Sequence, residues 1–204
     1  MYRCDPQHLL NWSQTMGTYS VFTTKVEIIV FNVNITPYTP HREEYQGRKL
    51  TVFLHFKEKI LPDNVVFYAP CQLKDNKKFF ETMEDEADDR LKIVASDSNA
   101  AADELLDWKY MKIIHSLTTQ PFLSSMFAQG LQDLILEGTQ TFLDHSFHVG
   151  HSSSRIDHFH GSTGILRSCT RPQVLKLTQS DHSLLWFWVK TRTLPSIPMF
   201  IPIS

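Results

Sequence analysis

The sequence predicts an α/β protein in which a mixed, largely parallel sheet is flanked by helices and followed by a poorly structured C-terminal segment. Three observations support this fold class. Strand-like and helix-like segments alternate between residues 50 and 137. The strand-like segments contain unbroken apolar runs, which suit strands that are covered on both faces. The composition then changes after Gly138. Alternation of strands and helices is typical of a sheet with parallel strands.

The expected strands are rich in β-branched and aromatic residues. The run VFTTKVEIIVFNVNI at 21–35 predicts one or two strands, and LTVFLHF at 50–56 predicts another. NVVFYAPC at 64–71 predicts a third after a turn that begins at Pro62. LKIVAS at 91–96 predicts a further strand.

Three helices are expected between and after these strands. Asp75 precedes residues with helical apolar spacing and is placed to cap the first helix. The apolar positions of that helix are Phe79, Phe80, Met83 and Ala87. Asp97 and Ser98 are placed to cap a second helix, whose apolar stripe runs over 102–117. Pro121 opens a third helix, and Gly138 stands at its expected end.

The change in composition divides the chain into two parts. Residues 1–138 are expected to form the α/β domain, and 139–204 a flexible or irregular segment rich in His, Ser and Pro. Glutamate does not occur after Glu137, and three prolines crowd the last ten residues.

The overall charge and the cysteines suggest a cytoplasmic protein without a polyanionic partner. The net charge is −2 and the pI is near 6.5, so there is no general electrostatic reason to bind nucleic acid or an anionic membrane. Three widely spaced cysteines form no C-x-x-C pair and fit a reducing compartment. The longest strongly apolar run, 184–189, is far shorter than the roughly 20 residues of a membrane-spanning helix.

A histidine-rich stretch raises the question of a metal site. The histidines are His145, His148, His151, His158 and His160. Neutral imidazole is a good ligand for zinc, but no pair here has the i, i+4 spacing that prepares two ligands on a helix. We therefore weigh a zinc-binding regulator against a solvated, His-rich tail, and favour the tail.

Acidic residues provide the second candidate site. Glu84–Asp89 contains five acids, which we interpret as a solvated face or a docking surface for a basic partner. Asp97 follows the strand at 91–96, and ligands of open α/β sheets bind at the carboxyl ends of strands. Together with Asp85, Asp88 or Asp89 it would offer oxygen ligands for Mg²⁺ or Mn²⁺. The simpler role of Asp97 is to cap the next helix.

From these observations we expect a non-catalytic protein–protein interaction or regulatory module with a protein partner. Its candidate contact surfaces are the acidic face around Glu84–Asp89 and the apolar C-terminal end. The main ground is that the sequence shows no glycine-rich phosphate loop and no assembled catalytic motif. The first alternative is a metal-dependent hydrolase or nuclease that uses Asp97 with the nearby acids. The second is a zinc-binding regulator built on the histidines.

Overall fold

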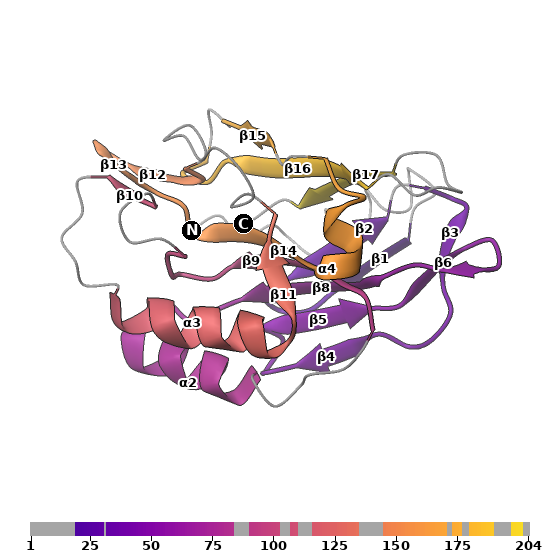
Figure 1. Cartoon of the computed structure of the whole chain (residues 1–204), viewed down its shortest axis with the longest axis horizontal. Coiled ribbons are helices and arrows are strands. Elements are labelled where there is room, and N and C mark those ends of the chain that lie inside the picture. The colour runs from indigo at the N-terminus through magenta and orange to yellow at the C-terminus, as the bar shows by residue number, and fades with distance from the viewer. Residues whose placement is uncertain are drawn as a thin grey trace.

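The centre of the molecule is a six-stranded sheet, shown in Figure 1. The computed structural model describes residues 19–30, 32–83, 90–102, 107–109, 116–134, 145–170, 173–176, 180–189 and 197–201. The order of strands in this sheet is β11-β14-β9-β8-β5-β4. Their bounds are β4 Arg42–Glu44, β5 Lys49–Val52, β8 Asp63–Tyr68, β9 Lys92–Asp97, β11 Leu131–Asp133 and β14 Asp157–Ser162. The predicted strands at 64–71 and 91–96 are therefore confirmed as β8 and β9.

The sheet is mixed, but the prediction that it is largely parallel is wrong. Among the described residues, β8 and β9 are the only parallel neighbours, and every other registered pair is antiparallel. The prediction took two-sided burial as a sign of parallel strands. Here the second face is covered by further strands instead of by helices, and that arrangement selects the same apolar residues.

Smaller sheets cover one face of the central sheet. They comprise β1 Tyr19–Phe22 with β2 Glu27–Val30, β3 Ile35–Pro37 with β6 Leu54–Phe56 and β7 Lys59–Ile60, and β15 Gln173–Leu175 with β16 Leu184–Val189 and β17 Ile197–Ile201. A further small sheet joins β10 Trp108–Lys109, β12 Phe147–Val149 and β13 Ser152–Ser154. Leu185 and Val189 of β16 pack in one core with Ala95 and Phe159 of the central sheet. Strands from the segment after residue 138 thus take part in both layers (Figure 1).

Two helices cover the other face, α2 Leu73–Met83 and α3 Ser116–Ala128 (Figure 1). A short helix, α4 Thr163–Leu166, follows β14. The prediction of a helix after Asp75 is confirmed, and its Phe79, Phe80 and Met83 are buried. Phe80 packs against Phe122 of α3 with ring centroids 5.1 Å apart. This aromatic contact joins the two helices above the sheet.

The other two helix predictions are wrong in part. Trp108–Lys109 form β10, so the helix expected over 102–117 is not continuous. The third helix already begins at Ser116 and ends at Ala128, well before Gly138. Gly130 has φ +66°, a left-handed conformation that ends the helix and that glycine adopts without strain. The described residues contain no helix that is long and apolar enough to cross a membrane.

Candidate metal centre

Three side chains lie in a row at one edge of the central sheet. In the strand register, Tyr68 of β8 is opposite Asp97 of β9, and Asp97 is opposite Asp157 of β14. Paired residues project from the same face of a sheet. That face carries Ala95, which packs against β16, so the row points toward the layer of smaller strands. Asp97 is 5% exposed and Asp157 is fully buried.

His182 completes the site from a third part of the chain. It lies just before β16, and its Nδ1 is 3.0 Å from Oδ2 of Asp157. Phe147 of β12 packs against its ring at 4.9 Å. The backbone of the next residue is anchored, because the N–H of Ser183 donates to the carbonyl of Ser146. These contacts fix the imidazole beside the two carboxylates.

Asp97, Asp157 and His182 form the one group in the described part of the chain with the geometry to hold a metal ion. One ligand atom from each residue lies within 4.8 Å of the others. Oδ2 of Asp157 accepts the hydrogen bond from His182, whereas its Oδ1 is buried and has no hydrogen-bond partner among the described residues. A buried carboxylate oxygen without a partner is costly, and a cation would satisfy it. Carboxylate oxygens are the ligands that Mg²⁺ and Mn²⁺ prefer, so Asp97 and Asp157 fit these cations.

The electrostatics of the site favour a bound cation. Burial and, after it, the negative charge of Asp157 raise the pKa of Asp97 to about 7, against the lowering effect of His182. Burial acts to lower the pKa of His182, but the hydrogen bond and charge of Asp157, with the charges of Asp97 and Asp181, outweigh it and raise that pKa. Both shifts have one origin, which is negative charge concentrated in a place that water does not reach.

Asp97 does not cap a helix, so that simpler role is excluded. Its Oδ1 accepts a hydrogen bond from the backbone N–H of Asn99 at 3.1 Å, and the chain then bends. Asn99 has φ +47° and donates from Nδ2 to the carbonyl of Ala69 at 2.9 Å. The turn after β9 is thereby tied to the turn after β8. This tie holds Asp97 and Tyr68 together at the edge of the sheet.

Arg48 and Tyr68 extend the site along the edge. Arg48 immediately precedes β5, and its carbonyl accepts a hydrogen bond from the N–H of Tyr68 at 2.8 Å. Its guanidinium lies over the Tyr68 ring, 5.5 Å from the centroid. The Tyr68 hydroxyl is 3.3 Å from Sγ of Cys71, an exposed cysteine. Burial raises the pKa of Tyr68, and its contact with Cys71 and the charge of Asp97 add to this effect. Tyr68 therefore stays a neutral donor.

A buried network of one arginine and two aspartates includes a residue close in sequence to Asp157. Arg155, two residues before Asp157, is 1% exposed. Its Nε is 2.7 Å from Oδ1 of Asp107, and its Nη1 is 2.7 Å from Oδ2 of Asp133. Asp107 also accepts a hydrogen bond from the N–H of Ala102 at 2.8 Å. Arg155 thus connects β14, β11 and the segment that follows Asp97.

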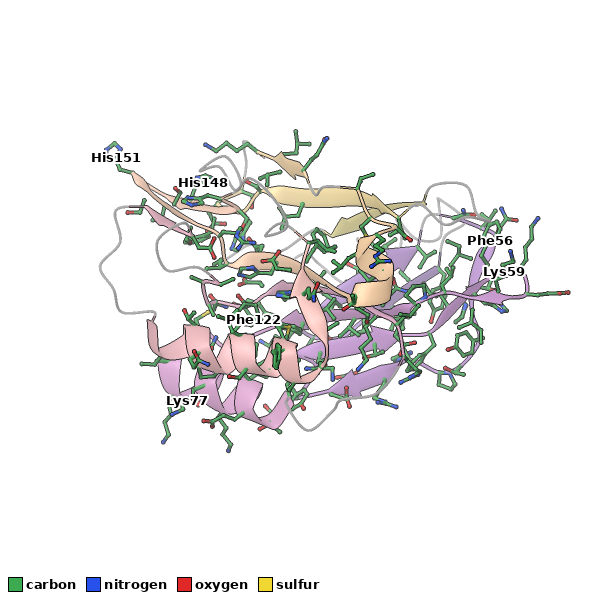
Figure 2. All side chains as sticks on the ribbon, in the orientation of Figure 1. Phe56, Lys59, Lys77, Phe122, His148 and His151 are labelled. Carbon is green, nitrogen blue, oxygen red and sulfur yellow. The ribbon has the colours of Figure 1, made fainter. Side chains whose placement is uncertain are left out.

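The histidines named from the sequence do not meet at one point, and none of them belongs to the group around Asp97. His145 is buried, with Nδ1 2.7 Å from Oγ of Ser153. His148 contacts the carbonyl of His145, and His151 is exposed at the turn between β12 and β13. Figure 2 shows His151 pointing away from the molecule. His158 and His160 lie inside, against the ring of Phe122.

Of the acids named from the sequence, Asp97 is at the site, while Asp85, Asp88 and Asp89 lie outside the described residues. Sequence reasoning missed Asp157 and His182. Neither had a clear local signal: Asp157 begins the segment DHFHGS that forms β14, in which two histidines obscure the apolar alternation, and His182 lies just before β16.

Comparison with known proteins identifies the fold. No family model matches the sequence, and no curated protein matches it. An AP endonuclease from Archaeoglobus fulgidus has a TM-score of 0.71 at 12% identity, covering 87% of this chain and 81% of its own. The 3′-5′ exonuclease NExo from Neisseria meningitidis has a TM-score of 0.67 at 16% identity, covering 87% and 82%. The 3′ phosphatase NExo from Neisseria, bound to a product DNA hairpin, has a TM-score of 0.65 at 16% identity, covering 88% and 81%.

These likenesses correct two predictions. The prediction of a non-catalytic, protein-binding module is wrong, since the fold is shared with proteins named as nucleases. The expectation that nothing points to nucleic acid is wrong on the same ground, because one of these structures holds DNA. The chain has the mixed α/β fold of these endonucleases and exonucleases.

Proposed function

We propose that this protein is a divalent-metal-dependent phosphodiesterase that cleaves nucleic acid. The observation that carries the proposal is the group formed by Asp97, Asp157 and His182 at the edge of a sheet whose fold is shared with nucleases. This was the alternative reading of the sequence, and Asp97 was its central residue. The other acids of that reading lie outside the described residues.

Asp97 and Asp157 would hold the cation. Oδ1 of Asp157 is available for it, because Oδ2 already accepts the hydrogen bond from His182. The raised pKa of Asp97 reflects burial beside another carboxylate, and a cation would favour its ionised form. When bound, the metal would act as a Lewis acid on a phosphoryl oxygen or on the attacking water.

His182 would move the proton. Because Nδ1 faces Asp157, the neutral imidazole carries its proton there and presents an unprotonated Nε2. The raised pKa makes Nε2 a better proton acceptor. Asp157 thus holds the ring in one tautomer and stabilises the imidazolium that forms. The same residue serves the cation and the histidine through different oxygens.

Arg48 and Tyr68 would bind the phosphate. The guanidinium of Arg48 lies over the Tyr68 ring and donates from Nη1 to the Tyr68 carbonyl at 3.3 Å. It is thereby fixed beside β8, the strand next to the one that carries Asp97. The Tyr68 hydroxyl is a neutral donor at the same edge. A guanidinium and a hydroxyl are suitable donors to phosphate oxygens.

A cleavage assay on the full chain tests the proposal. The substrates are fluorescent DNA duplexes, one with an abasic site and one with a 3′-phosphate end, incubated with Mg²⁺ or Mn²⁺ and with EDTA. Asp97→Asn, Asp157→Asn and His182→Gln are each expected to reduce the metal-dependent rate by about a hundredfold or more. Asp75→Asn and His151→Gln are controls, because both side chains are exposed and neither belongs to the group around Asp97.

The outcomes decide the proposal. Metal-dependent cleavage that is lost in the three variants and kept in the two controls supports it. Cleavage that survives EDTA, or that survives Asp97→Asn and Asp157→Asn in folded protein, refutes it. Circular dichroism of each variant shows whether the fold is intact.

A further inference from the structure

The candidate metal centre lies where the pairing of the central strands stops. The register of β8 with β9 ends at the pair Tyr68 and Asp97, and that of β9 with β14 ends at the pair Asp97 and Asp157. These residues therefore occupy the outermost pairs of both ladders. The ends of paired strands open more easily than their centres. The separation of the two aspartates thus depends on contacts beyond the strand ends.

Ser98 makes one such contact, and it joins the sequence neighbours of the two aspartates. It is fully buried, and its backbone N–H donates to the carbonyl of Ile156 at 2.8 Å. Its Oγ lies 2.9 Å from the same carbonyl oxygen and 2.7 Å from that of Ala100, and its single proton is donated to one of them at a time. Because Ser98 follows Asp97 and Ile156 precedes Asp157, this contact ties together the backbones that carry the two carboxylates.

Asn76 holds the same turn from the helix side. It lies in α2 and is 1% exposed. Its Nδ2 donates to the carbonyl of Ser98 at 2.9 Å and to that of Pro70 at 3.0 Å, which connects the turn after β9 with the turn after β8. Its Oδ1 is buried and has no hydrogen-bond partner among the described residues. A buried oxygen of this kind costs stability, and such local costs are expected mainly at functional sites.

Ser96 provides a comparison within the same strand. It immediately precedes Asp97, as Ser98 immediately follows it, and it is 1% exposed. Its Oγ is buried and makes no hydrogen bond within the described part of the chain. A buried serine beside Asp97 therefore does not by itself connect the two aspartates. Of these two serines, Ser98 alone makes the connection.

We propose that Ser98 and Asn76 are positioning residues that set the separation of the Asp97 and Asp157 carboxylates for a divalent cation. Both act through the backbone, and neither is a ligand. Mg²⁺ requires near-ideal octahedral geometry, whereas Ca²⁺ accepts longer and less regular contacts. A turn that holds two carboxylates at one separation therefore favours Mg²⁺ over Ca²⁺. The inference rests on the part of the proposed function in which the two aspartates hold a cation, and not on the cleavage step.

Calorimetric titration of the full chain with Mg²⁺ and, separately, with Ca²⁺ tests this inference. Ser98→Ala removes the hydroxyl and keeps the backbone contact with Ile156. Asn76→Ala loosens the same turn from α2, and it decides the question if Ser98→Ala does not fold. The matched control is Ser96→Ala, which makes the same change on the other side of Asp97 and removes no hydrogen bond among the described residues. Thermal unfolding in EDTA shows which variants are folded.

The Mg²⁺ affinity of Ser98→Ala is expected to fall about tenfold or more, as is typical when a residue that orients metal ligands is lost. Its Ca²⁺ affinity should fall about threefold or less, because Ca²⁺ tolerates a less regular arrangement. Asn76→Ala should show the same pattern, and Ser96→Ala should bind both cations as the wild type does. A fold that was merely looser would weaken the binding of both cations alike.

Four results would overturn the inference. They are an unchanged Mg²⁺ affinity in the folded Ser98→Ala and Asn76→Ala variants, an equal loss for Mg²⁺ and Ca²⁺, an equal loss in Ser96→Ala, and a wild-type chain that binds neither cation at millimolar concentration.

The titrations contain no nucleic acid, so they separate this inference from the proposed function. If the wild type binds Mg²⁺ but cleaves no substrate, the proposed function fails and the variants still decide the inference. If Ser98→Ala and Asn76→Ala bind Mg²⁺ like the wild type while Asp97→Asn abolishes cleavage, the inference fails and the proposed function stands.

Discussion

The buried network around Arg155 should dominate the stability of the region behind the candidate metal centre. We consider Arg155→Met, which keeps much of the side-chain volume and removes the charge. In the native protein Arg155 is 1% exposed and contacts Asp107 and Asp133 at 2.7 Å each. The substitution removes the guanidinium that contacts two buried carboxylates. It also weakens the connection between β14, β11 and the segment after Asp97.

The expected cost follows from the burial of all three groups. Removing one partner of a buried ion pair costs about 3–5 kcal/mol, because the remaining charge stays desolvated. Domains of this kind are stable by about 5–15 kcal/mol, so Arg155→Met should remove a large fraction of the total. With a urea dependence of about 2 kcal/mol per molar, the midpoint of unfolding should fall by roughly 1.5–2.5 M.

Urea unfolding followed by far-UV circular dichroism measures this effect. Arg167→Met is the matched control, since Arg167 is exposed, and it should change stability by about 0.5 kcal/mol or less. Adding Asp107→Asn and Asp133→Asn to Arg155→Met should recover part of the loss, because no buried charge is then left unpaired. A stability within about 1 kcal/mol of the wild type for Arg155→Met alone would refute the reasoning.

Three further predictions concern a buried histidine and the proposed site. Burial lowers the pKa of His160 to about 3, below its unfolded value near 6.5, so stability should fall as the pH drops below 6.5. The loss is about 2 kcal/mol at pH 5, and urea unfolding of His160→Gln should lack this dependence. Asp157→Asn should weaken Mn²⁺ binding about tenfold or more, as measured by calorimetric titration. An unchanged Mn²⁺ affinity would show that Asp157 is not a metal ligand. Arg48→Ala should raise KM about tenfold with a smaller change in kcat, and Arg48→Lys should recover part of the lost affinity. An effect of Arg48→Ala on kcat alone would exclude a role in binding.

Local sequence patterns predicted the strand that carries Asp97, but they did not predict the other residues of the site. The strand before Asp97 and its placement at a carboxyl end were correct, because both depend on a short run of neighbouring residues. Asp157 and His182 join Asp97 only through strand pairing between distant segments. No local pattern encodes such pairing, so these two residues were not predicted as part of the site.

Two histidines of β14 explain why the sequence predicted an irregular segment where this strand lies. In this strand His158 and His160 occupy inward positions and pack against Phe122, where an apolar residue is expected. Burial lowers the pKa of His160, so it is neutral near pH 7 and packs as an aromatic ring. A pattern that counts histidine as polar therefore misses the alternation of this strand.

The position of β14 between β9 and β11 has a consequence for synthesis on the ribosome. When Asp133 leaves the exit tunnel, β11 still lacks the neighbour that joins it to the sheet. The candidate centre is also incomplete until His182 has been translated, many codons after Asp97. A nascent chain therefore cannot bring Asp97, Asp157 and His182 together until most of its length has been made.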